Sequence, residues 1–478
     1  MATPLHLRHP ALLPLTALAA ATVFPFVGDD YQVDVGTGVL LFVILGLGIN
    51  VVVGMAGLLD LGYAAFYAIG AYTTAVLTAD AGLTWWQAVV PSMVVAAVAG
   101  AVLGYPTLRL RGDYLAIVTL GFGEIVRIAA INLDSLTGGS NGKVVGARPT
   151  VAGRELVSVQ DFYWLALALA VITGLATWNL ARSRLGRAWR ALAEDDRVAE
   201  AVGIPTVRVK LLAYVLGAVW AGLAGAFAAG KYGLVAPTSF TFTVSVLILV
   251  VVVLGGRGSF PGVVVGALVV VGVPEALRRV EEWKYLSFGV ALVALMLLRR
   301  GGLWPAGRRA SPASRPLDPG DPLLTHPGPA RLDIEGLTRA FGGLRALDEM
   351  SLAVHAGEIV GLIGPNGAGK TTVFNCVSGV IPPSSGLVTV GGHRLTDLSP
   401  HRVVRAGVGR TFQGVRLFSS MTVAENVLVG LDSRLRSGVT GSLLRLPGQR
   451  REERRAVAAA DHWLEVVGLG GRGGDLPG

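Results

Sequence analysis

Residues 364–372 read Gly-Pro-Asn-Gly-Ala-Gly-Lys-Thr-Thr, and this stretch decides the fold of the C-terminal part of the chain. It satisfies the pattern G-x-x-x-x-G-K-[ST]. The apolar run Glu358–Ile363 before it predicts a buried strand, and residues 371–378 predict the start of a helix. A strand, a glycine-rich turn and a helix in this order present backbone N–H groups to phosphate groups. The sequence therefore predicts an α/β domain with a phosphate-binding loop.

The residue types in this loop suit a nucleoside triphosphate. The glycines permit the tight turn, Lys370 would neutralise the β- and γ-phosphates, and Thr371 would offer a hydroxyl to Mg²⁺. We therefore expect a nucleoside triphosphate and Mg²⁺ as cofactors, and the resemblance to ABC ATPases described below implies ATP. The predicted ATP-binding residues of the loop are Gly364, Pro365, Asn366, Gly367, Ala368, Gly369, Lys370, Thr371 and Thr372.

The sequence before about Leu298 predicts a membrane domain. Hydrophobic residues make up 52% of the 478 residues and charged residues 15%, which excludes an ordinary soluble protein. A segment of about 20 apolar residues can cross a bilayer core of about 30 Å. Such segments lie near 10–28, 37–58, 61–79, 86–106, 114–131, 161–180, 211–229, 241–257, 262–278 and 284–298. Two of them, 114–131 and 262–278, carry internal charge and are candidates for re-entrant segments, so we predict a polytopic α-helical domain of about 8–10 spans.

The arginines predict the orientation of this domain. The formal net charge is +9, and the arginines stand in short blocks between apolar runs, at Arg109–Arg111, Arg182–Arg208 and Arg299–Arg300. Positive residues mark the cytoplasmic loops of membrane proteins. The pattern places the N-terminus and the C-terminal domain in the cytoplasm, and it indicates a lipid bilayer rather than a nucleic acid as partner. The single cysteine, Cys376, excludes an intrachain disulfide and a Cys-rich metal site.

Two charges lie inside one predicted span. Glu124 and Arg127 are three residues apart and share one face of a helix, where they can neutralise each other. A structural ion pair and a substrate contact both fit this spacing. Glu275 is near a predicted membrane boundary and Asp60 is at a predicted tight turn, so neither supports a proton relay.

The longest predicted inner loop, Arg182–Lys210, contains a helical pattern between Gly186 and Gly203. One interpretation is a helix that lies on lipid headgroups through its arginines. The other is a short helix that docks on the C-terminal domain and transmits its motion. The coupling residues predicted by the second interpretation are Gly186, Trp189, Glu194, Ala199 and Gly203.

Residues 301–330 form a Pro-rich segment between the two parts. We expect a semi-extended tether that buries no core and spans about 3 Å per residue. The predicted domains are thus a polytopic transmembrane domain at 1–300, a cytoplasmic linker at 301–330 and a nucleotide-binding domain at 331–478.

Several motifs resemble those of ABC ATPases. The loop GPNGAGKTT resembles their Walker A loop, and Gly409-Arg-Thr-Phe-Gln413 resembles their Q-loop. The resemblance implies that Gln413 reaches toward the metal and the attacking water, so Gln413 is the predicted catalytic residue and joins Thr371 as a metal ligand. Phe341 matches the aromatic residue that stacks on adenine, although a core aromatic is an alternative. The runs at 341–354 and 411–430 are most similar to the ATPase of branched-chain amino-acid importers.

The N-terminal part resembles the LivM-type permease of the same importers. The similar stretches include GINVVVGMAGLLDLGYAAFYAIGAY from Gly48, LRGDYLAIVTLGFGEIVRI from Leu110 and GRAWRALAEDDRVAEAVGI from Gly186. The resemblance implies ATP-driven import of branched-chain or related amino acids across the inner membrane. It also implies a second permease subunit, a further ABC ATPase subunit and an extracytoplasmic substrate-binding protein. Two alternatives stay open: an importer of urea or short amides, and a regulatory subunit that binds nucleotide without turnover.

The ABC resemblance is incomplete. Members of that family continue with a signature loop, a Walker B strand with a catalytic Glu, and a switch His, and none of these follows Gln413. We therefore expect an incomplete α/β P-loop domain, truncated before the signature motif, that does not hydrolyse ATP efficiently by itself. A fragment of a longer fusion would have this sequence.

Overall fold

The computed structural model describes residues 12–107, 113–276, 289–290, 293, 297–299, 301–307, 317–318, 320–324, 330–412, 414 and 416–477. The chain divides into two compact units. The first comprises Met1–Asn179 and Lys210–Gly307, and the second comprises Leu180–Val209 and Arg308–Gly478. The loop Leu180–Val209 therefore belongs to the C-terminal unit, although it lies between two apolar helices in the sequence.

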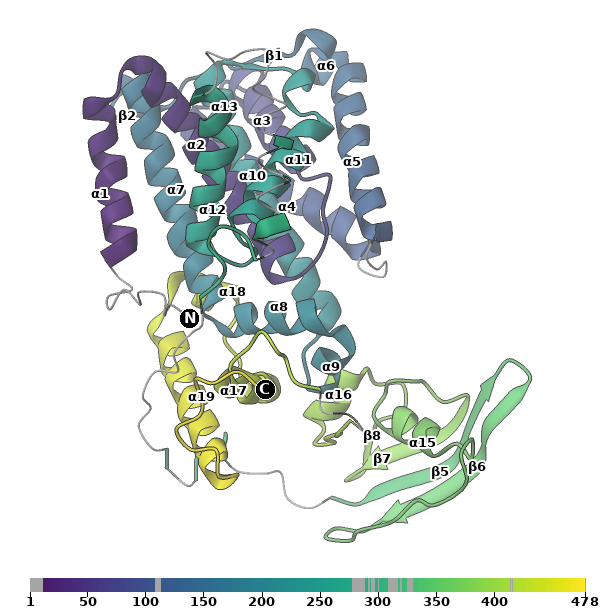
Figure 1. Ribbon diagram of the computed structural model, residues 1–478. Coiled ribbons are helices and arrows are strands. Elements are labelled where there is room, and N and C mark those ends of the chain that lie inside the picture. Colours follow the sequence, from purple (N-terminus) through teal and green to yellow (C-terminus); the bar gives the residue numbers. More distant parts are fainter. Residues whose placement is uncertain are drawn as a thin grey trace. The chain divides into compact units, whose positions relative to one another are not determined.

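The first unit is a bundle of apolar helices (Figure 1). Within the described residues, 6 helices have the length and composition to cross a membrane, and three apolar helices are shorter. Nine of the ten predicted segments are thus helices, whereas most of 284–298 lies outside the described residues. The bounds are α1 (Leu12–Val27), α2 (Asp30–Ile49) with the π-helix η1 (Asn50–Met55), α3 (Ala64–Ala79), α4 (Trp85–Thr107), α5 (Asp113–Asn132), α7 (Val159–Ala181), α10 (Thr206–Tyr232), α11 (Phe242–Gly255), α12 (Phe260–Ala267), η4 (Leu268–Gly272) and α13 (Val273–Ala276).

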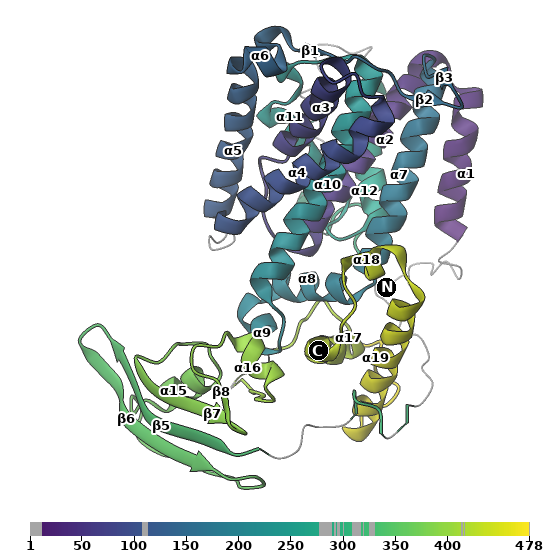
Figure 2. The same ribbon diagram turned by 180° about the vertical axis from the view of Figure 1, so that it is seen from behind.

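Short elements connect these helices. They are α6 (Asp134–Thr137), η2 (Gly139–Asn141), η3 (Pro237–Ser239), and the antiparallel pairs β1 (Lys143–Val144) with β4 (Leu234–Val235) and β2 (Thr150–Val151) with β3 (Arg154–Glu155). Figure 2 shows α3 and α4 side by side within this unit.

Small residues bring the helices of the first unit close together. A Cβ on Gly70 of α3 would lie 2.4 Å from the carbonyl oxygen of Gly222 in α10, and a Cβ on Gly225 would lie 2.3 Å from the Tyr67 carbonyl oxygen. Distances this short leave no room for a side chain, so the glycines allow backbone-to-backbone packing. They have a packing role and need no transport role.

Glu124, Arg127 and Asp60 of the first unit make local polar contacts. Glu124 and Arg127 of α5 form an ion pair at 2.8 Å, as expected from their spacing on one face of the helix. Asp60 is fully buried in the turn before α3, where its carboxylate accepts a hydrogen bond from the Gly62 N–H at 2.8 Å. This contact agrees with the predicted tight turn.

The second unit contains a four-stranded antiparallel sheet in the order β6-β5-β7-β8. The strands are β5 (Leu332–Phe341), β6 (Leu344–Val354), β7 (Ser385–Val390) and β8 (His393–Arg394). Helix α15 (Lys370–Val377) packs on this sheet and buries Val373 and Cys376 against Ile334, Leu337 and Val388. The predicted helix after the glycine-rich loop is confirmed.

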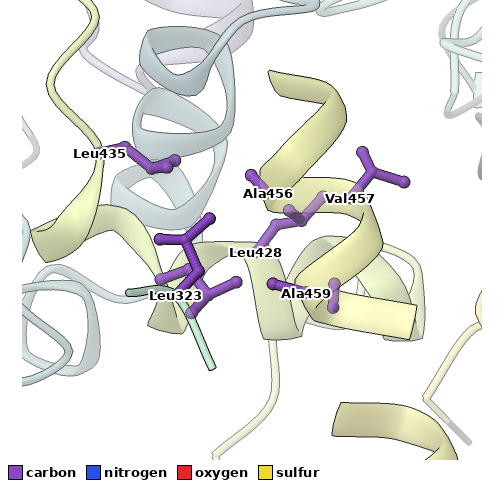
Figure 3. Close-up of a cluster of buried hydrophobic side chains, with 8 residues drawn as sticks. Leu323, Leu428, Leu435, Ala456, Val457 and Ala459 are labelled. Atoms are coloured by element: carbon purple, nitrogen blue, oxygen red, sulfur yellow. The ribbon is translucent and has the colours of Figure 1, made fainter. Parts of the chain in front are cut away.

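The second unit also contains several helices. They are α8 (Arg184–Glu194), α9 (Asp196–Ala201), α16 (Pro400–Arg405), α17 (Val423–Gly430), η6 (Asp432–Arg434), α18 (Val439–Leu444) and α19 (Pro447–Val466). Helices α17 and α19 pack through an apolar cluster that includes Leu428, Ala456 and Ala459 (Figure 3).

Part of the predicted linker joins this cluster. Leu323 is 7% exposed and packs among the residues of α17 and α19 (Figure 3), and Leu317 and Leu324 pack against them. Arg455 of α19 pairs with Asp321 at 2.8 Å. The prediction of a tether that buries no core is wrong for this portion. Burial of its leucines is favourable by more free energy than the loss of conformational entropy costs when the segment becomes ordered.

Candidate functional site

The glycine-rich loop leads directly into α15. Gly367 and Gly369 have positive φ angles of 88° and 81°, which favour glycine. A Cβ on Gly369 would lie 2.4 Å from the Ala346 carbonyl oxygen, so close approach to β6 also requires glycine there. Because α15 begins at Lys370, its first N–H groups have no partner within the helix and can serve an anion.

Lys370 closes over the loop that precedes it. Its ammonium group donates hydrogen bonds to the carbonyl oxygens of Gly364 at 2.6 Å and Pro365 at 2.7 Å. The loop thus combines backbone donors, a helix N-terminus and a cation, and Thr371 adds an exposed hydroxyl of the hard oxygen type that Mg²⁺ takes. These residues fit a polyphosphate with its metal ion.

The segment before the loop differs from its prediction. Glu358–Ile363 belongs to none of the strands of the described chain, and Ile359 and Ile363 are 98% and 92% exposed. The prediction of a buried strand is wrong for this structure. An apolar run becomes a buried strand only where neighbouring strands complete its hydrogen bonds, and the four paired strands of this unit lie elsewhere.

Phe341 lies at the end of β5, where it pairs with Leu344 across the hairpin. Its side chain is 44% exposed, and the Arg339 guanidinium lies 4.7 Å from the centre of its ring. Ala346 on the same hairpin contacts Gly369 of the loop. Phe341 is therefore a surface aromatic on a hairpin that packs against the glycine-rich loop, rather than a core residue.

A pocket of about 550 Å³ lies between α15 and the segment that follows α16. Thr371 and Phe374 line it from α15, and Gly409–Phe412 and Arg416 line it from the other side. Gln413, the predicted catalytic and metal-binding residue, lies outside the described residues. Its neighbours thus share a pocket with Thr371, the other predicted metal ligand.

The predicted helix at Gly186–Gly203 forms two helices, α8 and α9. The chain is extended at Asp195 between them, with φ −151° and ψ 106°, and the Asp195 carboxylate caps α9 by accepting from the N–H groups of Arg197 and Val198. Three of the predicted coupling residues form the inner side of this pair. Trp189 and Ala199 are fully buried, and a Cβ on Gly186 would lie 2.4 Å from the Ala181 carbonyl oxygen.

The other two predicted coupling residues touch the C-terminal part of the same unit. The Glu194 carboxylate accepts from the backbone N–H of Ser419 at 2.6 Å and of Ser420 at 2.8 Å, and from both serine hydroxyls. Gly203, at φ 104°, leaves space for Ser433, whose Cβ would lie 3.0 Å from a Cβ at this position. The segment is therefore held against the domain that carries the glycine-rich loop.

Charged residues that were not among the predicted coupling residues add ion pairs to this contact. Arg184 pairs with Asp432 at 2.7 Å, Arg190 pairs with Glu425 at 2.7 Å, and Arg187 pairs with Glu453. Arg416 adds a pair with Asp195 at 3.1 Å. The signal available in the sequence was the three-residue spacing of the arginines, which places them on one side of a helix. Arg184, Arg187 and Arg190 thus pair with carboxylates of the same unit, as expected for a helix that docks on the C-terminal domain.

Together, a bundle of membrane-length helices and a glycine-rich phosphate-type loop define a multi-pass membrane protein with a nucleotide-binding domain. A family model described as "Branched-chain amino acid transport system / permease component" matches residues 33–298, and one described as "ABC transporter" matches residues 347–474. The first match covers more than half of the chain. The chain belongs to the branched-chain amino acid transport system permease family, and it carries an ABC-transporter domain after the permease.

The high-affinity branched-chain amino acid transport system permease protein LivM of Salmonella typhimurium is 42% identical over 320 residues, which cover 62% of this chain and 75% of LivM. The ATP-binding protein BraF of Pseudomonas aeruginosa is 47% identical over 138 residues, or 29% of this chain. The chain spans 54% of the length of BraF. A crystal structure of a nucleotide-free ATP-binding cassette from an ABC transporter covers 31% of this chain and 59% of its own, at 32% identity and a TM-score of 0.25.

Proposed function

We propose that this chain takes part in ATP-driven import of branched-chain or related hydrophobic amino acids across the inner membrane. The observation that carries the proposal is that one chain contains both a glycine-rich loop that fits a nucleotide and a permease domain whose similarity to LivM extends over 75% of the length of LivM. A second permease subunit, a further ABC ATPase subunit and an extracytoplasmic binding protein would complete the transporter. The N-terminus and the C-terminal domain would be cytoplasmic, as the arginine blocks indicate.

The residues from Gly364 to Thr372 would hold the phosphates of ATP, with Phe341 against the base. Lys370 would exchange the carbonyl oxygens of Gly364 and Pro365 for phosphate oxygens, since a cation gains more from a charged acceptor. Thr371 and Gln413 would hold Mg²⁺, which would neutralise phosphate charge. Gln413 would also orient the attacking water once partner subunits complete the site.

Helices α8 and α9 would couple nucleotide binding to the permease. They continue from α7 and lead into α10, both of membrane length, while their side chains bind the nucleotide-binding domain. A force on this contact therefore has a covalent path into two spans. Asp195 and Arg416 connect the segment to one wall of the pocket that Thr371 lines.

Uptake of labelled leucine tests the proposal. A strain that lacks the gene, complemented with it and its partner genes, is expected to take up leucine in a manner that unlabelled leucine suppresses and urea does not. Suppression by urea alone would favour an importer of short amides and overturn the proposed substrate. Nucleotide binding without any supported uptake would favour the regulatory subunit.

A further inference from the structure

The arginines of α8 form a ladder along one side of the helix. Arg184, Arg187 and Arg190 are spaced by three residues, and each meets a carboxylate from a different element. The partners are Asp432 in η6, Glu453 in α19 and Glu425 in α17. One short helix thus contacts three different elements of the C-terminal part of the chain.

Each rung of the ladder uses two nitrogens of a guanidinium group. Arg184 donates to both Asp432 oxygens at 2.7 and 2.9 Å, and Arg190 donates to both Glu425 oxygens at 2.7 and 3.0 Å. Arg187 likewise donates to both oxygens of Glu453. The planar fork of arginine matches a carboxylate in this way, whereas the ammonium of lysine acts as a point charge. The contact therefore selects arginine and not only positive charge.

Each rung has one side chain that is largely shielded from water. The side chains of Asp432 and Arg187 are 5% and 7% exposed, and that of Glu425 is 11% exposed. A charge in such a place is costly when its partner is missing or carries the same sign. A helix with another charge pattern would leave carboxylates unpaired here, so the site penalises incorrect partners as well as binding the correct one.

The charge sign reverses at the C-terminal end of α8. Glu194 accepts from the Ser419–Ser420 turn, and Asp195 accepts from Arg416. Along the α8 segment, three arginines are followed by the acids Glu194 and Asp195. On the receiving surface, three acids are followed by the N–H donors of the Ser419–Ser420 turn and by Arg416. This order gives the contact a direction, because the reversed orientation would oppose like charges.

The receiving surface is held in place by its own hydrogen bonds. Glu425 belongs to the capping box of α17 with Thr422, from whose N–H it accepts at 3.2 Å. The Asn426 side chain accepts from the Phe418 N–H at 2.9 Å and donates to the Phe418 carbonyl oxygen at 3.1 Å. The turn that binds Glu194 and the acid that binds Arg190 are therefore parts of one stiff element.

We propose that this charge order is a recognition code by which the nucleotide-binding domain selects the α8–α9 segment of its own chain over coupling segments of other charge pattern. The inference rests on the proposed coupling role of α8 and α9, and it names the residues that give the coupling contact its specificity. Arg184, Arg187 and Arg190 are specificity-determining residues, and Glu194 and Asp195 set the direction.

Charge reversal at Arg187 and Glu453 tests the code in the full chain, reconstituted in lipid nanodiscs. This rung is chosen because Glu453 lies inside α19 rather than in a helix cap. Hydrogen–deuterium exchange in peptides covering residues 184–194 and 416–426 reports docking, because the Ser419 and Ser420 amides donate to Glu194. We expect Arg187→Glu to speed exchange in both peptides at least tenfold, and Arg187→Glu with Glu453→Arg to restore it to within twofold.

Two further variants keep the test decisive. Arg187→Lys, which keeps the positive charge but lacks the planar fork, is expected to give an intermediate rate, and Arg197→Glu, at an exposed arginine of α9, is expected to leave exchange unchanged. The code would be overturned if neither Arg187→Glu nor Arg187→Lys changed the exchange rate. It would also be overturned if Arg197→Glu accelerated exchange as much as Arg187→Glu does. Failure of leucine uptake with normal protection would contradict the proposed function and leave the code intact.

Discussion

The glycine-rich loop and the docked α8–α9 segment belong to the same compact unit and are built in opposite ways. The loop is a local structure whose residues are consecutive, and most of its side chains are exposed. The docked segment depends on residues more than 200 positions away, and its main side chains are buried or paired. The loop is ready for a ligand that comes and goes, whereas the docked segment already has its partner.

This difference matches two roles: the loop would bind nucleotide, and the docked segment would transmit motion to the permease domain. A nucleotide site needs free donors, so its residues can contribute little to stability. A mechanical contact needs partners that stay together under load, and paired, shielded charges meet that need. We therefore expect substitutions in the loop to change ligand affinity with the fold intact, and substitutions around the docked segment to change stability and docking.

The largest expected effect is on nucleotide affinity. Lys370→Ala removes the ammonium that would bind two phosphates, so we expect affinity for a fluorescent ATP analogue to fall by about a hundredfold or more, on the order of 3 kcal/mol. Membrane insertion and exchange protection of residues 416–426 should be unchanged. Lys370→Arg, the matched control, keeps the charge and should retain part of the affinity. If the wild-type and Lys370→Ala proteins bound the analogue with equal affinity, the loop would not be part of the nucleotide site.

The sequence predicted most of what depends on neighbours along the chain. The apolar segments became helices because a helix satisfies its backbone groups internally. Helix α15 and the turns at Gly367 and Gly369 followed from their motif. Glu358–Ile363 was predicted incorrectly because a strand depends on neighbouring strands. The partners of Arg184 and Arg187 were missed because 248 and 266 residues separate them from Asp432 and Glu453, and no local pattern encodes such a distance.

A smaller effect tests the support beneath the docked segment. Leu323→Ala leaves a cavity between α17 and α19, the elements that carry Glu425 and Glu453, so we expect a loss of about 2–3 kcal/mol of stability. Denaturant unfolding followed by exchange in α19 peptides measures it. Leu344→Ala, at a leucine that is 69% exposed on β6, is the control and should cost less than about 0.5 kcal/mol. Equal losses of unfolding free energy in the two variants would show that this part of the linker adds no core packing and acts as a tether.

The smallest effect concerns an ion pair outside the ladder. Arg345 and Asp348 pair at 2.9 Å, with side chains 69% and 61% exposed. Water screens such a pair, so Arg345→Ala should change the free energy of unfolding by less than about 0.5 kcal/mol, and 0.5 M salt should remove that change. Arg187→Ala should cost more, although less than the about 3–5 kcal/mol of a fully buried pair, because Glu453 keeps 24% exposure. Similar costs for the two arginines would show that shielding adds nothing to the ladder, and the contrast between the exposed loop and the docked segment would then rest on Glu194 and the apolar contacts alone.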